Sequence, residues 1–276
     1  MTKLVLIVCD ALRDDVAAAQ MGYLEHLVEQ NIASRYTVVA QMPTMSRPNY
    51  ETIHTGVPSS VHGITSNYEI RPSKMPNLFS LARERNLTTA ASAFYWYSEL
   101  YNGTVPYDPV IHHEVDDETL NIQHGRFYGV PALHTAQPDV EVFSAGAMLA
   151  YRFQPDYLLI HPMQADDIGE TYGGDSVQYR RTVIAQDAII ANLLTRLQPA
   201  GYNVIVTSDH GMSDDPSTHG GSLPEVRHVP LYYIPTSGGG LGNTGQKVSQ
   251  LQLAPTICNL LNIPIPNTMA APPLAF

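Results

Sequence analysis

The sequence predicts an α/β fold, a doubly wound and mostly parallel sheet flanked by helices. Apolar runs of strand length alternate with segments of helical period, which is the pattern of such sheets. Three predicted strands, at 4–9, 157–161 and 203–208, each run out into an aspartate. A hydrophobic fraction of 44% over 276 residues suffices for one substantial core. We therefore expect one domain, residues 1–276, with acidic side chains gathered at the carboxyl ends of parallel strands.

The other elements follow in chain order. Leu24, Leu27 and Val28 are spaced for one helix face and predict a helix over 16–29. Further strands are expected at 34–40, 88–94 and 230–234, and further helices at 46–54, 77–85, 140–152, 176–197 and 251–261. Between 95 and 138 the alternation falters, because aromatic residues, histidines, prolines and glycines crowd together. We expect this segment to be a small, irregular, cap-like insertion near the active site; the alternative is a surface lobe of packed aromatics.

Composition narrows the class of partner. Fifteen basic and 26 acidic residues give a net charge of −11, which disfavours binding to nucleic-acid polymers or anionic lipid. A phosphate-bearing substrate would then need local positive charge from metal ions. Cys9 and Cys258 are expected to be buried small hydrophobes. The amino terminus enters a strand at once, without a signal peptide or membrane span, so a cytoplasmic protein with no membrane partner is expected, its oligomeric state left open.

A proline-initiated helix places a serine at a special position. Proline at the start of a helix costs no hydrogen bond, so Pro48 places Ser46 or Arg47 at or just before a helix amino terminus. A serine there either caps the helix or acts as a nucleophile. As a nucleophile, Ser46 would gain from the unpaired amides and the helix dipole, which favour an alkoxide and an incoming phosphoryl oxygen.

The segment 43–64, which contains Ser46, resembles the nucleophile motif of the alkaline phosphatase superfamily, most closely its nucleotide pyrophosphatase/phosphodiesterase branch. Further motifs follow the family's order at 10–13, 166–173, 208–212, 219–221 and 253–264, with Ala11 in place of the usual glycine. The resemblance makes Ser46 the nucleophile, in preference to Thr44. It also makes Asn67 the donor to the phosphoryl oxygen.

The same resemblance implies two divalent metal ions, with zinc expected. The first would be held by Asp10, Ser46, Asp209 and His210, and the second by Asp166, His219 and Glu170. Glu170 stands where the family has a histidine. Residues four apart share a helix face, and a carboxylate can ligate zinc, so Glu170 remains a candidate ligand. A carboxylate favours manganese or iron at the Asp166/Glu170/His219 site. Alternatively, Glu170 does not bind and the second site is weak or empty.

Several rival assignments remain open. Asp167 is the rival of Asp166 as a ligand, and His228 is the rival of His219. Arg13 is either a phosphate contact or part of an ion pair with Asp14 or Asp15. Arg47 is a second candidate phosphate contact, and Trp96 is a candidate stacking surface for a base or sugar. Other histidines are assigned to packing, hydrogen bonding or the surface, namely His54, His62, His112, His113, His124, His134 and His161.

By resemblance, the chain is a metal-dependent hydrolase of small-molecule phosphate esters, in first place phosphodiesters or nucleotide pyrophosphates, acting through a covalent phosphoseryl intermediate on Ser46. Alternatives are a phosphonoacetate-like phosphonate hydrolase, a phosphomonoesterase, or a catalytically degraded relative that binds a ligand. The chain lacks the Cys/Ser-x-Pro-x-Arg motif of sulfatases. The absence of a membrane segment argues against a glycolipid transferase, and the short length argues against a phosphate mutase with its large cap domain.

Overall fold

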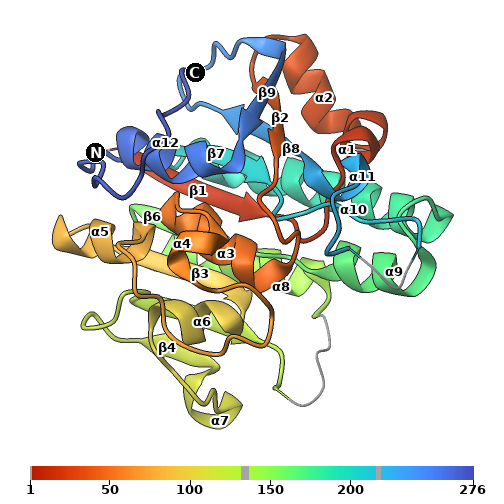
Figure 1. Cartoon of the computed structure of the whole chain (residues 1–276). Helices are drawn as coiled ribbons and strands as arrows, with labels where there is room; N and C mark the ends of the chain where they lie inside the picture. Colours follow the sequence, from red (N-terminus) through yellow and green to blue (C-terminus); the bar gives the residue numbers. More distant parts are fainter. Residues whose placement is uncertain (1, 132–136, 216–218) are drawn as a thin grey trace.

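A mixed sheet runs through the middle of the molecule, with helices on both of its faces (Figure 1). The computed structural model describes residues 2–131, 137–215 and 219–276. In these residues the sheet has nine strands in the order β4-β5-β3-β6-β1-β7-β8-β2-β9. Only β4 and β8 run antiparallel to their neighbours, so the predicted, mostly parallel α/β fold is confirmed.

The strands are β1 (Lys3–Val8), β2 (Ser34–Val39), β3 (Thr89–Phe94), β4 (Glu114–Asp116), β5 (His124–Tyr128), β6 (Tyr157–Ile160), β7 (Tyr202–Thr207), β8 (His228–Ile234) and β9 (Gly242–Ser249). The helices are α1 (Asp14–Gln20), α2 (Gly22–Glu29), α3 (Ser46–Thr55), α4 (Ser59–His62), α5 (Leu78–Glu84), α6 (Trp96–Tyr101), α7 (Pro109–His112), α8 (Asp139–Phe153), α9 (Gln164–Tyr172), α10 (Val177–Leu197), α11 (Pro224–Arg227), the 3-10 turn η1 (Gln250–Gln252) and α12 (Leu253–Leu260).

The three strands that run out into aspartates lie side by side at the centre of the sheet. β1 pairs in parallel with β6 on one side and with β7 on the other. Apart from Lys3, which is half-buried, all residues of these strands are buried, which explains their mostly apolar sequences. Their carboxyl ends therefore meet at one edge, as expected. β8 runs the opposite way, so the segment that leads into it also starts at this edge.

Two helical layers cover the sheet. α3, α5 and α12 pack against one another on one face, and α8 and α10 pack together on the other, with α8 seated on β3 and β6 (Figure 1). A single apolar cluster spans both layers. It includes Cys9 and Cys258, both fully buried as predicted.

The helix predicted over 16–29 is two helices, which is a correction to that expectation. The chain leaves the helical conformation at Met21, and α2 begins at Gly22. The carboxylate of Asp187, far along the chain in α10, accepts hydrogen bonds from the backbone N–H groups of Tyr23 and Leu24. Because this cap comes from a distant helix, local sequence gives no sign of it.

The segment 95–138 is more regular than its composition indicates. It contains α6 and α7, and its strands β4 and β5 extend the main sheet beyond β3. α6 packs against the helix that begins with Ser46. Residues 132–136, and with them the expectation for His134, lie outside the described part of the chain.

Candidate active site

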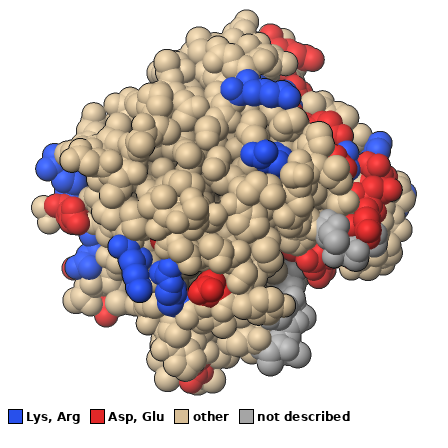
Figure 2. Space-filling view, in the orientation of Figure 1, with Lys and Arg blue, Asp and Glu red and all other residues tan. Residues whose placement is uncertain are grey.

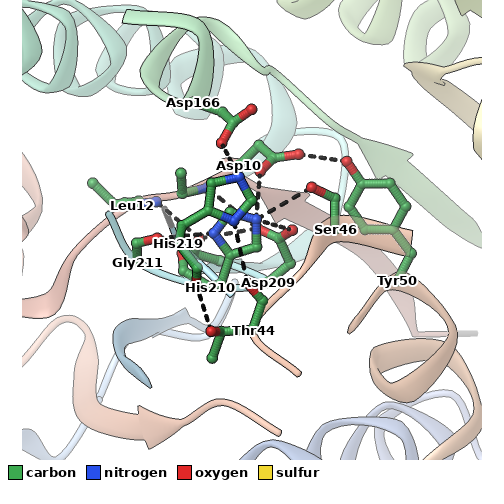
Figure 3. Close-up of polar contacts among 12 residues, drawn as sticks. Asp10, Leu12, Thr44, Ser46, Tyr50, Asp166, Asp209, His210, Gly211 and His219 are labelled. Carbon is green, nitrogen blue, oxygen red and sulfur yellow. Dashed lines mark hydrogen bonds and ion pairs between the residues drawn. The ribbon is translucent and has the colours of Figure 1, made fainter. Parts of the chain in front are cut away.

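Four predicted site residues meet in a buried group at the edge where β1 and β7 end (Figure 3). Measured from Nε2 of His210, Ser46 Oγ is 3.2 Å away, Asp209 Oδ2 is 3.3 Å away and Asp10 Oδ1 is 3.4 Å away. The side chains of Asp10, Asp209 and His210 are 0% exposed. We call these four residues the buried group.

The spacing in the buried group matches that of ligands around one small cation. Two ligand atoms of a tetrahedral zinc ion, each about 2.0–2.1 Å from the metal, lie about 3.3–3.4 Å apart. The three distances from His210 Nε2 fall at or near this value. The donor set of two carboxylates, an imidazole and a hydroxyl also suits zinc or manganese.

Two carboxylate oxygens of this group lack a hydrogen-bond partner within the described ranges. Asp10 Oδ1 and Asp209 Oδ2 are buried and have no hydrogen-bond partner among the described residues. Burial, and then the negative charge of Asp209, raise the pKa of Asp10 well above its usual range. Unpartnered buried carboxylate oxygens are costly unless they are paired or coordinated, so these residues fit a divalent ion.

His210 is oriented for coordination. Its Nδ1 lies 2.8 Å from the backbone oxygen of Gly211, an acceptor, so Nδ1 carries the proton. Burial lowers the pKa of His210 to about 4, so the ring is neutral at physiological pH. The lone pair of Nε2 therefore faces Asp10, Asp209 and Ser46, which is the usual arrangement of a metal-binding histidine.

A second group, the outer group, consists of Asp166, Glu170 and His219. His219 Nε2 lies 3.8 Å from Asp166 Oδ1 and 3.0 Å from Glu170 Oε1. Asp166 Oδ1 is buried without a hydrogen-bond partner, and burial followed by the charge of Asp10 raises its pKa well above the usual range. The His210 and His219 rings stack with centroids 4.3 Å apart, so the two groups adjoin.

Glu170 is held differently from the other predicted ligands. Its side chain is 53% exposed and pairs with His219, and the close set of ligand atoms here is formed by Asp166, His210 and His219 without it. Asp166 and Glu170 lie four residues apart on α9, so the helical turn expected between them is present. In Figure 2, acidic side chains gather at the side of the molecule where Figure 1 shows α9 and α10.

Ser46 is the first residue of α3, which confirms its predicted position at a helix amino terminus. It does not cap the helix, because the N-cap position is occupied by Met45. Thr44, the alternative candidate nucleophile, makes different contacts. Its hydroxyl lies 2.5 Å from the backbone oxygen of His219 and 2.7 Å from that of Gly221, so it holds the segment that carries His219.

Asn67 lies against the start of α3. Its Oδ1 accepts the backbone N–H of Arg47 at 3.0 Å, which fixes the side-chain amide one residue from Ser46. The Nδ2 group takes no part in that bond. The donor role expected for Asn67 stays a prediction.

The expectations for Arg47 and Trp96 need correction. Arg47 is fully buried, and its guanidinium pairs with Glu99 at 2.6 Å and lies over the Trp96 ring at 4.4 Å. Because the Arg47 side chain is fully buried and Nη2 pairs with a buried carboxylate, we assign it a structural role, although Nη1 has no hydrogen-bond partner among the described residues. Trp96 is only 8% exposed, so it offers little surface to a base or sugar.

The structure also locates the other residues that the sequence offered as alternative site residues. Arg13 pairs with Asp15 at 2.7 Å and with Asp175 at 2.9 Å, as the ion-pair interpretation predicts. Asp167 is exposed and belongs to neither ligand group within the described residues. His228 lies on β8, 3.5 Å from Lys247. Two further histidines are buried in hydrogen bonds and packing, as expected, His54 and His62.

His161 is the site residue that sequence reasoning missed. It is fully buried, and its Nε2 lies 3.1 Å from Asp10 Oδ2. It had been assigned no site role because it lacks ligand spacing. Its place directly after β6, at the edge where Asp10 and Asp209 lie, is the signal that could have found it.

Ala11 shows why the family motif has a glycine at this position. Its φ is 61°, in the left-handed region that costs a residue with a Cβ about 1–2 kcal/mol. The backbone is held there by its neighbours, because Ala11 N–H donates to Asp209 Oδ1 at 3.2 Å and Tyr179 O–H donates to Ala11 O at 2.5 Å. The turn thus ties Asp10 to Asp209.

Known proteins resemble the chain in both sequence and fold. Human GPI ethanolamine phosphate transferase 2, catalytic subunit, is 26% identical over 286 residues, covering 96% of this chain and 27% of that protein. Murine ectonucleotide pyrophosphatase/phosphodiesterase 5 superposes with a TM-score of 0.75 at 13% identity over 96% of each chain. Phosphonoacetate hydrolase from Sinorhizobium meliloti 1021 gives a TM-score of 0.54 at 21% identity, covering 76% of this chain and 56% of that one.

The chain spans about a quarter of the length of the human transferase (27%), so the absence of a membrane segment here does not argue against a transferase. Within the described ranges, every helix is too short or too polar to cross a bilayer. The resemblance to the alkaline phosphatase superfamily is confirmed, because a model of the type I phosphodiesterase/nucleotide pyrophosphatase family matches residues 4–246. The chain belongs to the type I phosphodiesterase/nucleotide pyrophosphatase family.

Proposed function

We propose that the chain is a metal-dependent enzyme that cleaves phosphodiesters or nucleotide pyrophosphates through a covalent phosphoseryl intermediate on Ser46. The observation that carries this proposal is the convergence of Ser46 Oγ, at 3.2 Å from His210 Nε2, with two buried and unpartnered carboxylate oxygens. Such surroundings favour nucleophilic attack by the serine over capping.

Asp10, Asp209, His210 and Ser46 would hold one divalent ion, and Asp166 and His219, with or without Glu170, a second. When bound, such ions polarise phosphoryl oxygens and lower the pKa of a neighbouring hydroxyl. Zinc is expected in the buried group, and manganese or iron are alternatives in the outer group, where Glu170 makes the ligand set harder.

The first half of the reaction follows from the position of Ser46. Its Oγ attacks phosphorus, a serine–phosphorus ester bond forms, and the bond to the leaving oxygen breaks with its electron pair staying on that oxygen. The proton of the Ser46 hydroxyl goes to solvent, and the leaving oxygen takes a proton from solvent. Pro48 has no N–H, and the N–H groups of Arg47 and Asn49 are taken by Asn67 and Met45, so the helix dipole and the N–H of Ser46 itself would favour the incoming phosphoryl group.

The second half returns the enzyme to its starting state. A water oxygen attacks phosphorus, the ester bond to Ser46 breaks, and the serine oxygen regains a proton. In both halves the Nδ2 group of Asn67 would donate to the equatorial oxygen that gains charge. The bond from Arg47 N–H to Asn67 Oδ1 orients that donor.

Transfer to an alcohol is a second candidate for the same site. The sequence identity to a GPI ethanolamine phosphate transferase, 26% along 96% of this chain, favours it. The two reactions share the phosphoseryl intermediate and differ in whether water or an alcohol attacks it. Whether the reaction is hydrolysis or transfer, the cytoplasmic location and the small-molecule substrate expected from sequence stay predictions.

The test is turnover of a chromogenic phosphodiester with added zinc or manganese. We expect Ser46→Ala to lower kcat by at least about 10³-fold, because the nucleophile is lost. The matched control is Ser92→Ala, which removes another buried serine hydroxyl, one that donates to Val142 O. Acid-quenched wild type should carry the phosphoester on the Ser46 peptide.

A Ser46→Ala variant that turns over at the wild-type rate would rule out the covalent mechanism. Wild-type protein with neither turnover nor a trapped ester, across a panel of diesters, monoesters and phosphonates, would favour the degraded, ligand-binding relative. In the same assay with an added alcohol, the ratio of the alcohol's phosphoester to the hydrolysis product separates transfer from hydrolysis.

A further inference from the structure

The two carboxylate oxygens of Asp10 have different surroundings. Oδ2 accepts a hydrogen bond from the hydroxyl of Tyr50 and lies 3.1 Å from Nε2 of His161. Oδ1 has no hydrogen-bond partner among the described residues and lies 3.4 Å from Nε2 of His210. One oxygen of this buried carboxylate is thus held by the protein, and the other faces the remaining atoms of the buried group.

The position of the His161 proton follows from its neighbours. Tyr128 O–H donates to the backbone oxygen of His161 at 2.6 Å and lies 3.2 Å from Nδ1 of the same residue. With its proton on Nε2, His161 donates to Asp10 Oδ2, and the Tyr128 hydroxyl lies between two acceptors. With the proton on Nδ1 alone, the lone pair of Nε2 would face a carboxylate oxygen. The first arrangement places a donor against the buried carboxylate, whereas the second places a lone pair there, so we assign the proton to Nε2.

Both donors sit in a rigid surrounding. Tyr50 stacks on Tyr97 with ring centroids 4.5 Å apart, and His161 contacts both rings at 4.8 and 5.1 Å. All three side chains are fully buried. Tyr50 also lies four residues after Ser46, one turn along the same face of α3, so the helix that presents the nucleophile also holds Asp10.

We propose that His161 and Tyr50 are positioning residues, which hold Asp10 through Oδ2 so that Oδ1 alone serves as its ligand atom for a divalent cation. Two donors on one oxygen fix the rotamer of the carboxylate and direct its second oxygen toward the other ligands. The inference rests on the proposed function, because it assigns a task to residues around the proposed metal site.

The experiment measures zinc affinity by competition with a chromophoric chelator, and zinc content after dialysis by elemental analysis. We expect His161→Leu to weaken zinc binding by about 10–100-fold, the effect typical of residues that orient metal ligands. His161→Gln should restore most of the affinity, because its amide N–H can donate to Asp10 Oδ2. A structural role alone would not distinguish Leu from Gln in this way.

Tyr50→Phe is the second variant, because it removes only a hydroxyl and keeps the ring stack even if His161→Leu fails to fold. We expect about tenfold weaker zinc binding for Tyr50→Phe. The control is His54→Gln, which changes another buried histidine, one bonded to Tyr50 O and Tyr157 OH and not to a ligand carboxylate. It should bind zinc like the wild type.

The outcomes separate this inference from the proposed function. If the wild type binds zinc, and the folded His161→Leu and Tyr50→Phe variants bind it equally well, the positioning role is overturned and the proposed function stands. If the wild type binds no divalent cation, both are overturned.

Discussion

The buried and outer groups differ in how firmly the protein holds their side chains. Asp10 and Asp209 are 0% exposed and are fixed by Tyr50, His161 and the turn at Ala11. In the outer group, Glu170 is 53% exposed and already pairs with His219 at 3.0 Å. In the buried group two carboxylate oxygens are oriented and have no hydrogen-bond partner among the described residues, whereas in the outer group a ligand atom of His219 is engaged by a neighbouring acid.

This difference indicates that Glu170, in place of the family's histidine, acts most directly on the outer group, because its carboxylate pairs with His219. A cation entering the buried group meets carboxylate oxygens without partners. A cation entering the outer group must compete with the ion pair between Glu170 and His219. We therefore expect the buried group to bind a divalent cation more tightly than the outer group. The serine nucleophile, Ser46, belongs to the buried group.

The largest expected effect separates the two groups by their aspartates. Asp209→Asn should remove metal from the buried group and lower turnover by about 10³-fold or more, because the nucleophile loses its activating surroundings. Asp166→Asn should leave one metal ion per chain in the buried group. Elemental analysis after dialysis, beside the diesterase assay, measures both.

The comparison would break if Asp166→Asn lost as much metal as Asp209→Asn, since the groups would then behave as one cooperative site. Asp167→Asn is the control, because Asp167 is an exposed acid on the same helix as Asp166 and lies outside the ligand groups of the described residues. Its metal content should equal that of the wild type.

The central fold could be predicted because its signals are local. The three buried strands have mostly apolar sequences, each is followed by an aspartate at most six residues later, and parallel pairing brings their ends together. Other features depend on distant partners. β9 is an edge strand of mostly polar residues, and the break between α1 and α2 is capped by Asp187 of α10. No local period marks either one.

The candidate site shows the same division. The motif residues Asp10, Ser46 and His210 could be placed from sequence because their spacing is that of a family. The corrected role of Arg47 could not, because its partner Glu99 lies 52 positions away, in the segment with the least regular sequence. His161 was missed for a related reason, since a lone histidine has no spacing, and only the fold shows that it meets Asp10.

Glu170→His is the next largest expected effect and sharpens the comparison directly. Imidazole is a softer ligand than carboxylate and would not form the ion pair that keeps His219 protonated. Zinc binding in the outer group should therefore tighten by about 10–100-fold, with a smaller gain for manganese. Metal titrations on the Asp209→Asn background isolate this group. An unchanged ratio of zinc to manganese affinity would mean that residue 170 is not a ligand.

Per pH unit, the smallest expected effect is the difference in pH dependence between the two groups. Each group contains an aspartate of raised pKa, so this difference arises from the histidines. Burial alone would lower the pKa of His219 from 6.5, but the hydrogen bond to Glu170 and the charge of Asp166 raise it to about 10 in the metal-free protein. His210, by contrast, has its pKa lowered to about 4 by burial and is already neutral.

The sign follows from these two values. The His219 ion pair stabilises the metal-free fold fully below pH 6.5, and this stabilisation is lost as pH rises through about 10. A cation needs the neutral imidazole, so metal affinity in the outer group should rise with pH in that window, by at most about tenfold per pH unit from this proton. The His210 proton adds no such slope in the buried group.

Titrations of metal affinity between about pH 6 and pH 9 on the Asp209→Asn and Asp166→Asn variants compare the outer and buried groups. Glu170→Gln should flatten the outer slope, because without the carboxylate His219 loses its proton at lower pH; equal slopes in both groups would show that the ion pair does not hinder the metal.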